Sequence, residues 1–111
     1  MGSHRKGDEM KATTKATWQE DVLDQPLVLV YFWAAWCRPC TMQAPIVEQL
    51  EQDIALLSVV KIDADTNPDL VEELAVSSIP TLILYKNGEH IFTLHGAKPR
   101  GRLLEEIAPF V

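Results

Sequence analysis

The sequence predicts an α/β fold, in which a central mixed β-sheet of about five strands is flanked by about four helices. Apolar runs rich in β-branched and aromatic residues alternate with segments of helical period, which is typical of strand–helix–strand units. The dipeptide Asn87-Gly88 favours a type I′ hairpin turn, because both central positions of that turn need positive φ. The length of 111 residues fits one domain, and a hydrophobic fraction of 47% is enough for a core.

The first nine residues are polar and lack periodicity, so we interpret residues 1–9 as a vector scar or a disordered lead. The single folded domain is then expected to span residues 10–111. No internal repeat or low-complexity tract divides this stretch.

Three elements are predicted in the first third of the domain. Residues 10–14 are expected to form a short edge strand, and residues 16–23 a short helix with Trp18 and Val22 turned inward. Residues 27–33, with the sequence LVLVYFW, are apolar on both faces. This pattern predicts a fully buried central strand.

A helix is predicted over residues 40–53 and is expected to open at Cys37. Its inward side chains are predicted to be Ile46, Val47, Leu50 and Ile54, with Glu48, Glu51 and Gln52 outside. The strand before it leads directly into Cys37, which places the cysteines at the carboxyl end of a central strand. Open α/β sheets have their active sites at such ends.

The rest of the chain continues the alternation and ends in a hairpin and a helix. Strands are predicted over residues 56–62, 81–85 and 91–94, and helices from Asn67-Pro68 to about Val76 and over residues 99–108.

Composition excludes several classes of function. The 10 basic and 16 acidic residues give a net charge of −6, which argues against nucleic acid as the main partner. The longest apolar run, residues 27–37, is shorter than the ~20 residues that a membrane helix needs. The first fifteen residues contain no apolar segment of a secretory signal, so we expect a cytoplasmic protein.

The two cysteines lie in the motif Trp36-Cys37-Arg38-Pro39-Cys40, for which four interpretations compete. A structural disulfide would close a loop too short to restrain the unfolded chain usefully. A structural zinc site needs four ligands, and only His4, His90 and His95 are available to join the cysteines, without suitable spacing. Two buried, unreactive cysteines are the third interpretation. A redox-active dithiol is the fourth, and the motif favours it.

Local physical chemistry supports redox activity. A helix that opens at Cys37 brings unpaired N–H groups and the positive end of its dipole to that sulfur, and both stabilise a thiolate. Arg38 adds a positive charge beside it, and Pro39 stiffens the loop. We therefore expect Cys37 to attack a substrate disulfide and Cys40 to resolve the mixed disulfide.

The chain resembles the thioredoxin family over about residues 17–108. The resemblance is carried by WCRPC after LVLVYFWAA and by several later segments in the family's order. These segments are Pro45, Lys61-Ile62-Asp63, Ser78-Ile79-Pro80-Thr81, Lys86-Asn87-Gly88-Glu89 and Gly96-Ala97.

The resemblance implies further parts of the site. Pro80 would follow a cis peptide bond and face the cysteines, and the Ile79 backbone would pair with an extended substrate peptide. Trp36, Gly96 and Ala97 would complete an apolar rim around Cys37. Disulfide-containing proteins would be the substrates, and a flavoprotein like thioredoxin reductase would supply electrons to a monomeric protein. The redox group would be the cysteine pair itself, without a metal or organic cofactor.

The sequence departs from the family at the position of a buried Asp behind the second cysteine, where it has Tyr31. Tyrosine is neutral at pH 7, so the loss of a buried negative charge predicts a lower pKa for Cys37. Lys61 then lacks its usual partner and is expected to point to solvent or to bond Tyr31. His95 replaces an apolar rim residue, and if it lies near Cys37 its protonation would favour the thiolate.

Two rival functions follow from the same residues. Tyr31 and Arg38 permit an oxidase or isomerase, with the same chemistry run in the other direction. A module that binds peptides in the groove without catalysis is the second rival, and the intact WCRPC motif argues against it.

Overall fold

The structure is a computed structural model that describes residues 10–111, and the interpretation of residues 1–9 lies outside this part. Five strands form one sheet in the order β1-β3-β2-β4-β5. They are β1 (Lys11–Ala12), β2 (Leu27–Trp33), β3 (Ser58–Asp63), β4 (Thr81–Lys86) and β5 (Glu89–His95). β3 is parallel to β1 and β2, whereas β4 is antiparallel to β2 and β5. The mixed sheet is therefore confirmed, with β2 at its centre.

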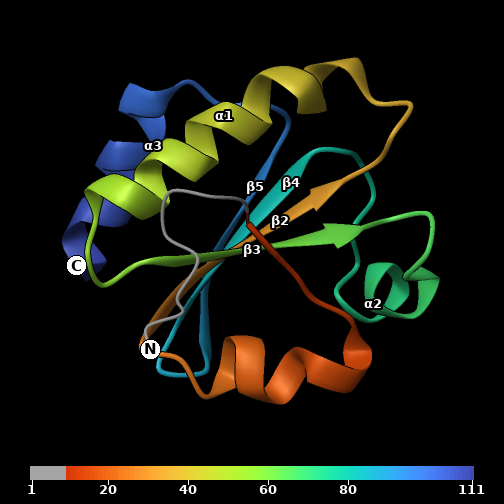
Figure 1. Ribbon diagram of the computed structural model, residues 1–111, viewed down its shortest axis with the longest axis horizontal. Helices are drawn as coiled ribbons and strands as arrows, with labels where there is room; N and C mark the ends of the chain where they lie inside the picture. The colour runs from red at the N-terminus through yellow and green to blue at the C-terminus, as the bar shows by residue number, and fades with distance from the viewer. Residues whose placement is uncertain (1–9) are drawn as a thin grey trace.

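Helices cover both faces of this sheet (Figure 1). α1 and α3 lie on one face, and α2 and the short segments η1 and η2 lie on the other. The α-helices are α1 (Arg38–Asp53), α2 (Pro68–Glu73) and α3 (Arg100–Ile107). η1 (Lys15–Thr17) and η3 (Ala108–Phe110) are 3₁₀-helices, and η2 (Gln19–Leu23) is a π-helix.

The two faces have separate hydrophobic cores, which β2 joins. Alternate side chains of a strand point to opposite faces, so β2 contributes three residues to each core. Leu27, Leu29 and Tyr31 pack with α1 and α3, and Val28, Val30 and Phe32 pack with η2 and α2. All six are at most 2% exposed. The predicted burial of this strand on both faces is confirmed.

The predicted short helix over residues 16–23 is present, but it consists of a 3₁₀-helix followed by a π-helix and not of one continuous α-helix. Local polar contacts shape it. The Thr14 N–H and the Thr17 hydroxyl oxygen are 3.2 Å apart, and the buried Asp21 carboxylate accepts a hydrogen bond of 3.0 Å from the Thr13 hydroxyl. Such side-chain bonds compete with regular helical bonding in short segments.

Two other predictions are also corrected. α2 ends at Glu73 rather than near Val76, because Ala75 has φ of 55°, which no right-handed helix contains. Glu51 is buried rather than outside, and its carboxylate accepts a hydrogen bond of 2.9 Å from the Val59 N–H.

The hairpin between β4 and β5 has the geometry that the sequence predicts. Asn87 and Gly88 have φ of 52° and 81°. A Cβ atom on Gly88 would lie 2.9 Å from the backbone oxygen of Leu23, so glycine is needed there for space as well as for φ.

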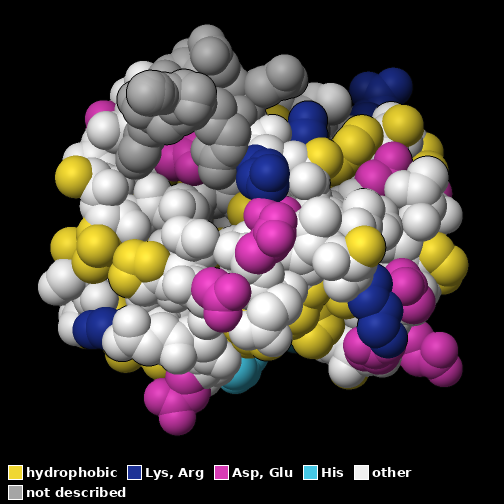
Figure 2. Space-filling model, turned by 60° about the horizontal axis from the view of Figure 1, so that its bottom comes forward, with side chains coloured by type: hydrophobic (Ala, Val, Ile, Leu, Met, Phe, Trp, Pro, Cys, Tyr) yellow, Lys and Arg dark blue, Asp and Glu magenta, His cyan; other side chains and the backbone are white. Residues whose placement is uncertain are grey.

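Acidic and basic side chains are interspersed on the face shown in Figure 2, between small groups of apolar atoms. Among residues 10–111, no helix is long and apolar enough to cross a membrane.

Candidate active site

The cysteine motif occupies the junction between β2 and α1. β2 ends at Trp33, and α1 begins at Arg38, so Cys37 is the residue that caps the helix. The Cys37 N–H donates a hydrogen bond of 3.1 Å to the Ala34 oxygen, which closes a tight turn before the helix. The predicted position at the carboxyl end of the central strand is confirmed.

Cys37 and Cys40 are joined by a disulfide, and their Cα atoms are 5.3 Å apart. The Cys40 N–H also points at the Cys37 sulfur, with a separation of 3.2 Å. The two cysteines are only 4% and 3% exposed, whereas Arg38 and Pro39 between them are exposed. A backbone N–H and the first turn of α1 therefore face Cys37 Sγ, an arrangement that stabilises negative charge on the sulfur.

The Ile79–Pro80 peptide bond is cis, as the resemblance implied. Pro80 is buried at the start of β4, and its oxygen accepts a hydrogen bond of 2.9 Å from the Gly96 N–H. Gly96 has φ of 83°, which glycine adopts without strain. The turn at Pro80 and the loop after β5 are thus bonded together, with Ala97 in that loop.

Trp36 is 66% exposed, and its indole N–H lies 3.0 and 3.2 Å from the two carboxylate oxygens of Asp65. The N–H of Asp65 in turn donates to Asp63, which ends β3. The sequence did not predict a role for Asp65. Trp36 and Asp65 are 29 residues apart in the chain, and no motif shows that a carboxylate in the loop after β3 reaches the indole.

Tyr31 lies beneath the first turn of α1, and its hydroxyl donates a hydrogen bond of 2.9 Å to the Cys40 oxygen. Burial raises the pKa of Tyr31 to about 12, so its hydroxyl is neutral at pH 7, as expected. The Lys61 ammonium group is 5.8 Å from the centre of the Trp33 ring, in cation–π geometry.

A small cavity of about 240 Å³ reaches the disulfide from the Tyr31 side. Tyr31 and Lys61, the two residues predicted to tune the thiol pKa, line this cavity together with both cysteines. It is formed by Tyr31, Trp33, Ala34, Ala35, Cys37, Cys40, Thr41, Ala44 and Lys61.

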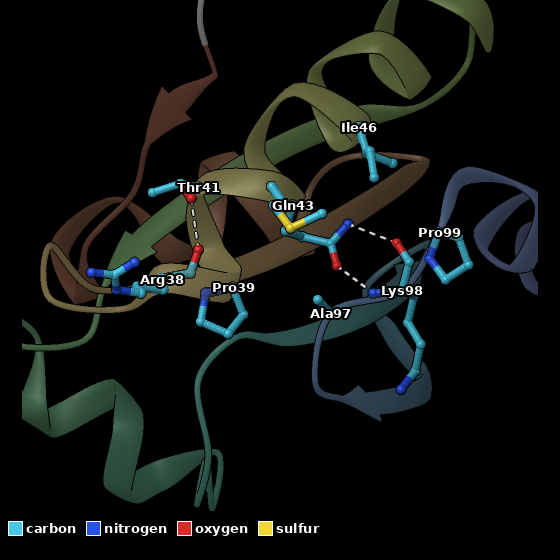
Figure 3. Close-up of a pocket in the computed structure, with 9 residues that line it drawn as sticks. Arg38, Pro39, Thr41, Gln43, Ile46, Ala97, Lys98 and Pro99 are labelled. Atoms are coloured by element: carbon cyan, nitrogen blue, oxygen red, sulfur yellow. Dashed lines mark hydrogen bonds between the residues drawn. The ribbon is translucent and has the colours of Figure 1, made fainter.

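A larger groove of about 640 Å³ runs between α1 and the loop before α3 (Figure 3). Arg38 and Pro39 line one end, and Ala97, Lys98 and Pro99 form the opposite wall.

The buried Gln43 spans this groove's base and was also missed by the sequence reasoning. The sequence does contain a sign of its role, because Gln43 is a polar residue at an inward position of the helix. Cys40, Gln43 and Val47 are all buried on one side of α1.

His95 is exposed at the end of β5, where its backbone pairs with Thr81. Its influence on Cys37 stays a prediction. Among residues 10–111, no group of three or more His, Cys, Asp or Glu side chains is placed to hold a metal ion.

Comparison with known proteins agrees with the family resemblance found in the sequence. The sequence profile described as Thioredoxin matches residues 9–109. A thioredoxin of Mycobacterium tuberculosis (strain ATCC 25618 / H37Rv) is 46% identical over 101 residues, which cover 88% of this chain and 86% of the relative. A thioredoxin of Listeria monocytogenes is 40% identical over 103 residues, covering 92% and 99%. The solved structure of a mutant thioredoxin from Halobacterium salinarum NRC-1 superposes with a TM-score of 0.87 at 29% identity, covering 98% of this chain and 96% of that one.

Proposed function

The chain belongs to the thioredoxin family and is a thiol–disulfide oxidoreductase, and from this premise we propose that Cys37 is its attacking sulfur and Cys40 its resolving sulfur. The observation that supports these roles best is the position of Cys37 as the cap of α1, with the Cys40 N–H directed at its sulfur. Thiolate is the reactive form in disulfide exchange, and a helix N-terminus favours it.

In the proposed reaction the Cys37 thiolate attacks one sulfur of the substrate disulfide. A Cys37–substrate mixed disulfide forms, and the other substrate sulfur leaves as a thiolate that takes a proton from water. Cys40 then loses its proton to water and attacks Cys37 Sγ, which releases the second substrate thiolate and forms the Cys37–Cys40 disulfide. Two electrons pass from the protein to the substrate, and a thioredoxin-reductase-like flavoprotein, as the family implies, restores the dithiol.

The substrate polypeptide is proposed to lie between Trp36, the turn at Pro80 and the loop containing Gly96 and Ala97. The resemblance to the family supports strand-like pairing of an extended peptide with the Ile79 backbone. The hydrogen bond between the Gly96 N–H and the Pro80 oxygen supports this proposal, because it holds the turn and the loop against each other as one wall of the proposed peptide site.

Trapping of the mixed disulfide tests the two cysteine roles. In Cys40→Ser the resolving step is lost, so we expect a stable covalent adduct between Cys37 and a disulfide-containing protein such as insulin. Mass spectrometry of the adduct identifies the linked cysteine. Cys37→Ser is the matched control and should form no adduct, and an adduct on Cys40 in that variant at the same rate would refute the assignment.

The physiological direction is proposed to be reduction. A reduction potential near ~−270 mV would support a reductase, whereas ~−120 to −180 mV would indicate an oxidant or isomerase. Redox equilibration with glutathione buffers measures it. If Cys37→Ser/Cys40→Ser retained the cellular activity, the non-catalytic binding module would replace both proposals.

We further propose that residues 10–111 act as a monomeric domain in the cytoplasm, where the protein carries electrons and helps to maintain redox homeostasis. The extent of the family match, residues 9–109, supports the single domain. Analytical ultracentrifugation and fractionation of cells with an antibody test the oligomeric state and the location.

A further inference from the structure

Gln43 is a fully buried polar side chain on α1 that the proposed reaction does not use. Its amide faces the backbone of Lys98 in Figure 3. The Lys98 N–H donates to Gln43 Oε1 at 2.7 Å, and Gln43 Nε2 donates to the Lys98 oxygen at 3.1 Å. One side chain therefore satisfies both backbone polar groups of one residue, and movement of that residue away from α1 would break both bonds.

The same loop is bonded to the cis-proline turn at its other end. The Gly96 N–H donates to the Pro80 oxygen at 2.9 Å, two residues before Lys98. The segment 96–98 is thus connected to the turn at Pro80 on one side and to α1 on the other. α1 begins directly after Cys37. The hydrogen bonds of Gly96 and Lys98 therefore connect α1 to the loop 96–98 and to the turn at Pro80, the two segments proposed to contact the substrate peptide.

Packing alone does not explain a glutamine at this position. The neighbouring inward residues of α1 include Val47 and Leu50, which belong to the hydrophobic core, so an apolar side chain would suit the burial. Burial of an amide is unfavourable unless its hydrogen bonds are replaced, and here the two replacements both go to Lys98.

We infer that Gln43 is a positioning residue that fixes the loop 96–98 against α1 and thereby sets the affinity for polypeptide disulfides. This inference rests on the proposed function, since it assigns that loop to the substrate groove. A polypeptide contacts the loop, whereas a small disulfide reaches Cys37 without it. Loss of the two bonds should therefore raise KM for protein substrates and leave the chemistry at the sulfur unchanged.

The first test replaces Gln43 by methionine, which has similar length and flexibility but neither a strong donor nor a strong acceptor. With dithiothreitol as electron donor, we expect KM for insulin to rise about fivefold while kcat stays within about twofold, the effect of losing buried hydrogen bonds at the loop. Activity on 2-hydroxyethyl disulfide, a small neutral substrate, should stay within about twofold of the parent.

Gln49→Met is the matched control on the same helix. The Gln49 side chain is exposed and bonds only Asp53 among the hydrogen bonds described for residues 10–111, at 3.1 Å. This variant should leave the kinetic constants for both substrates at their parent values.

Hydrogen exchange reports on the loop directly and does not depend on substrate. In Gln43→Met the Lys98 amide should exchange at least about tenfold faster than in the parent, while core amides of β2 keep their protection. Gln43→Glu is the conservative second variant, because a protonated carboxyl both donates and accepts. The ratio of its KM values for the two substrates should approach the parent ratio near pH ~5, where a buried glutamate is protonated, and depart from it above pH ~9, where a buried glutamate ionises.

The outcomes separate this inference from the proposed function. An active Gln43→Met variant with unchanged KM for insulin, or with unchanged exchange at Lys98, would overturn the positioning role while the proposed function stands. A parent protein that reduces neither substrate would instead refute the proposed function. Equal losses on both substrates would show a general structural defect and would also overturn the inference.

Discussion

Tyr31 places a neutral hydroxyl beneath the first turn of α1, at the position where the resemblance to the family implies a buried carboxylate. Its hydroxyl donates to the Cys40 oxygen, and burial raises its pKa to about 12. Tyr31 and both cysteines line the same small cavity, so any charge placed at this position acts on the thiols at short range.

A Tyr31→Asp variant should have a higher pKa for the Cys37 thiol than the parent protein. A buried carboxylate disfavours a second negative charge nearby, and we expect a rise on the order of one pH unit. The rate of alkylation of the reduced protein by iodoacetamide, measured against pH, gives this pKa. Tyr31→Phe is the uncharged control and should match the parent. Equal values for the Asp and Phe variants would contradict the electrostatic role of this position.

Residues of the site differ in how far the sequence could predict them. Cys37, Cys40 and the cis bond before Pro80 follow from local motifs or from the family pattern that carries them. The partners of Gln43 and of Trp36 depend on which loop lies opposite, at Lys98 and at Asp65 respectively. Such contacts are decided by tertiary packing, which hydrophobic periodicity and single motifs do not encode.

At the scale of elements, strong patterns were predictable and weak ones were not. The run LVLVYFW is apolar on both faces, and its burial in the sheet centre was correctly predicted. The segment 16–23 is short, and the spacing of its apolar residues does not determine which kind of helix forms. Hydrogen bonds such as that between Thr13 and Asp21 contribute to its geometry. α2 ends early at a backbone angle of Ala75 that has no clear sequence signal.

The β4–β5 hairpin needs glycine at position 88, because the backbone there has positive φ and a side chain would contact Leu23. In Gly88→Ala the new Cβ would meet the Leu23 oxygen at 2.9 Å, at φ of 81°. We expect the free energy of unfolding to fall by about 1–3 kcal/mol, as for strained positive-φ substitutions. Urea denaturation followed by circular dichroism measures the change.

Gly101→Ala provides the matched control within α3. A Cβ at Gly101 meets nothing within 4 Å, and alanine favours helix more than glycine does. This variant should unfold at the same or a higher urea concentration, with a gain of up to about 1 kcal/mol. If both alanine variants lost stability equally, the turn geometry would not be the cause.

At the scale of the whole molecule, two cores on opposite faces of one sheet stabilise the fold, and each contains a buried tyrosine. Tyr31 lies in the core under α1 and α3, and Tyr85 in the core against η2 and α2. Burial raises the pKa of both side chains above the ordinary value of 10.0, to about 12 for Tyr31. Ionisation of either one would therefore couple to global unfolding.

The oxidised protein should lose stability as pH rises above ~10, the ordinary pKa of tyrosine. The unfolded chain releases the tyrosine protons first, so the folded state binds more protons and the free energy of unfolding falls with pH. The contribution of Tyr31 to the free energy of unfolding is fully present below the unfolded pKa of 10.0. It is lost as pH rises to about 12, which lowers the free energy of unfolding by about 2–3 kcal/mol. Urea denaturation at several alkaline pH values checks this, and Tyr31→Phe should show a shallower dependence. An identical slope in that variant would contradict the assignment.

The carboxylate of Glu51 affects the sheet at the margin formed by β1 and the adjoining part of β3. β1 is only two residues long, and it pairs with Val60 and Lys61, whereas the adjacent Val59 N–H is taken by Glu51 at 2.9 Å. A strand from another molecule that approached this margin would find the donor already occupied and a carboxylate beside it. We therefore expect Glu51 to disfavour the pairing of an additional strand at this position of β3.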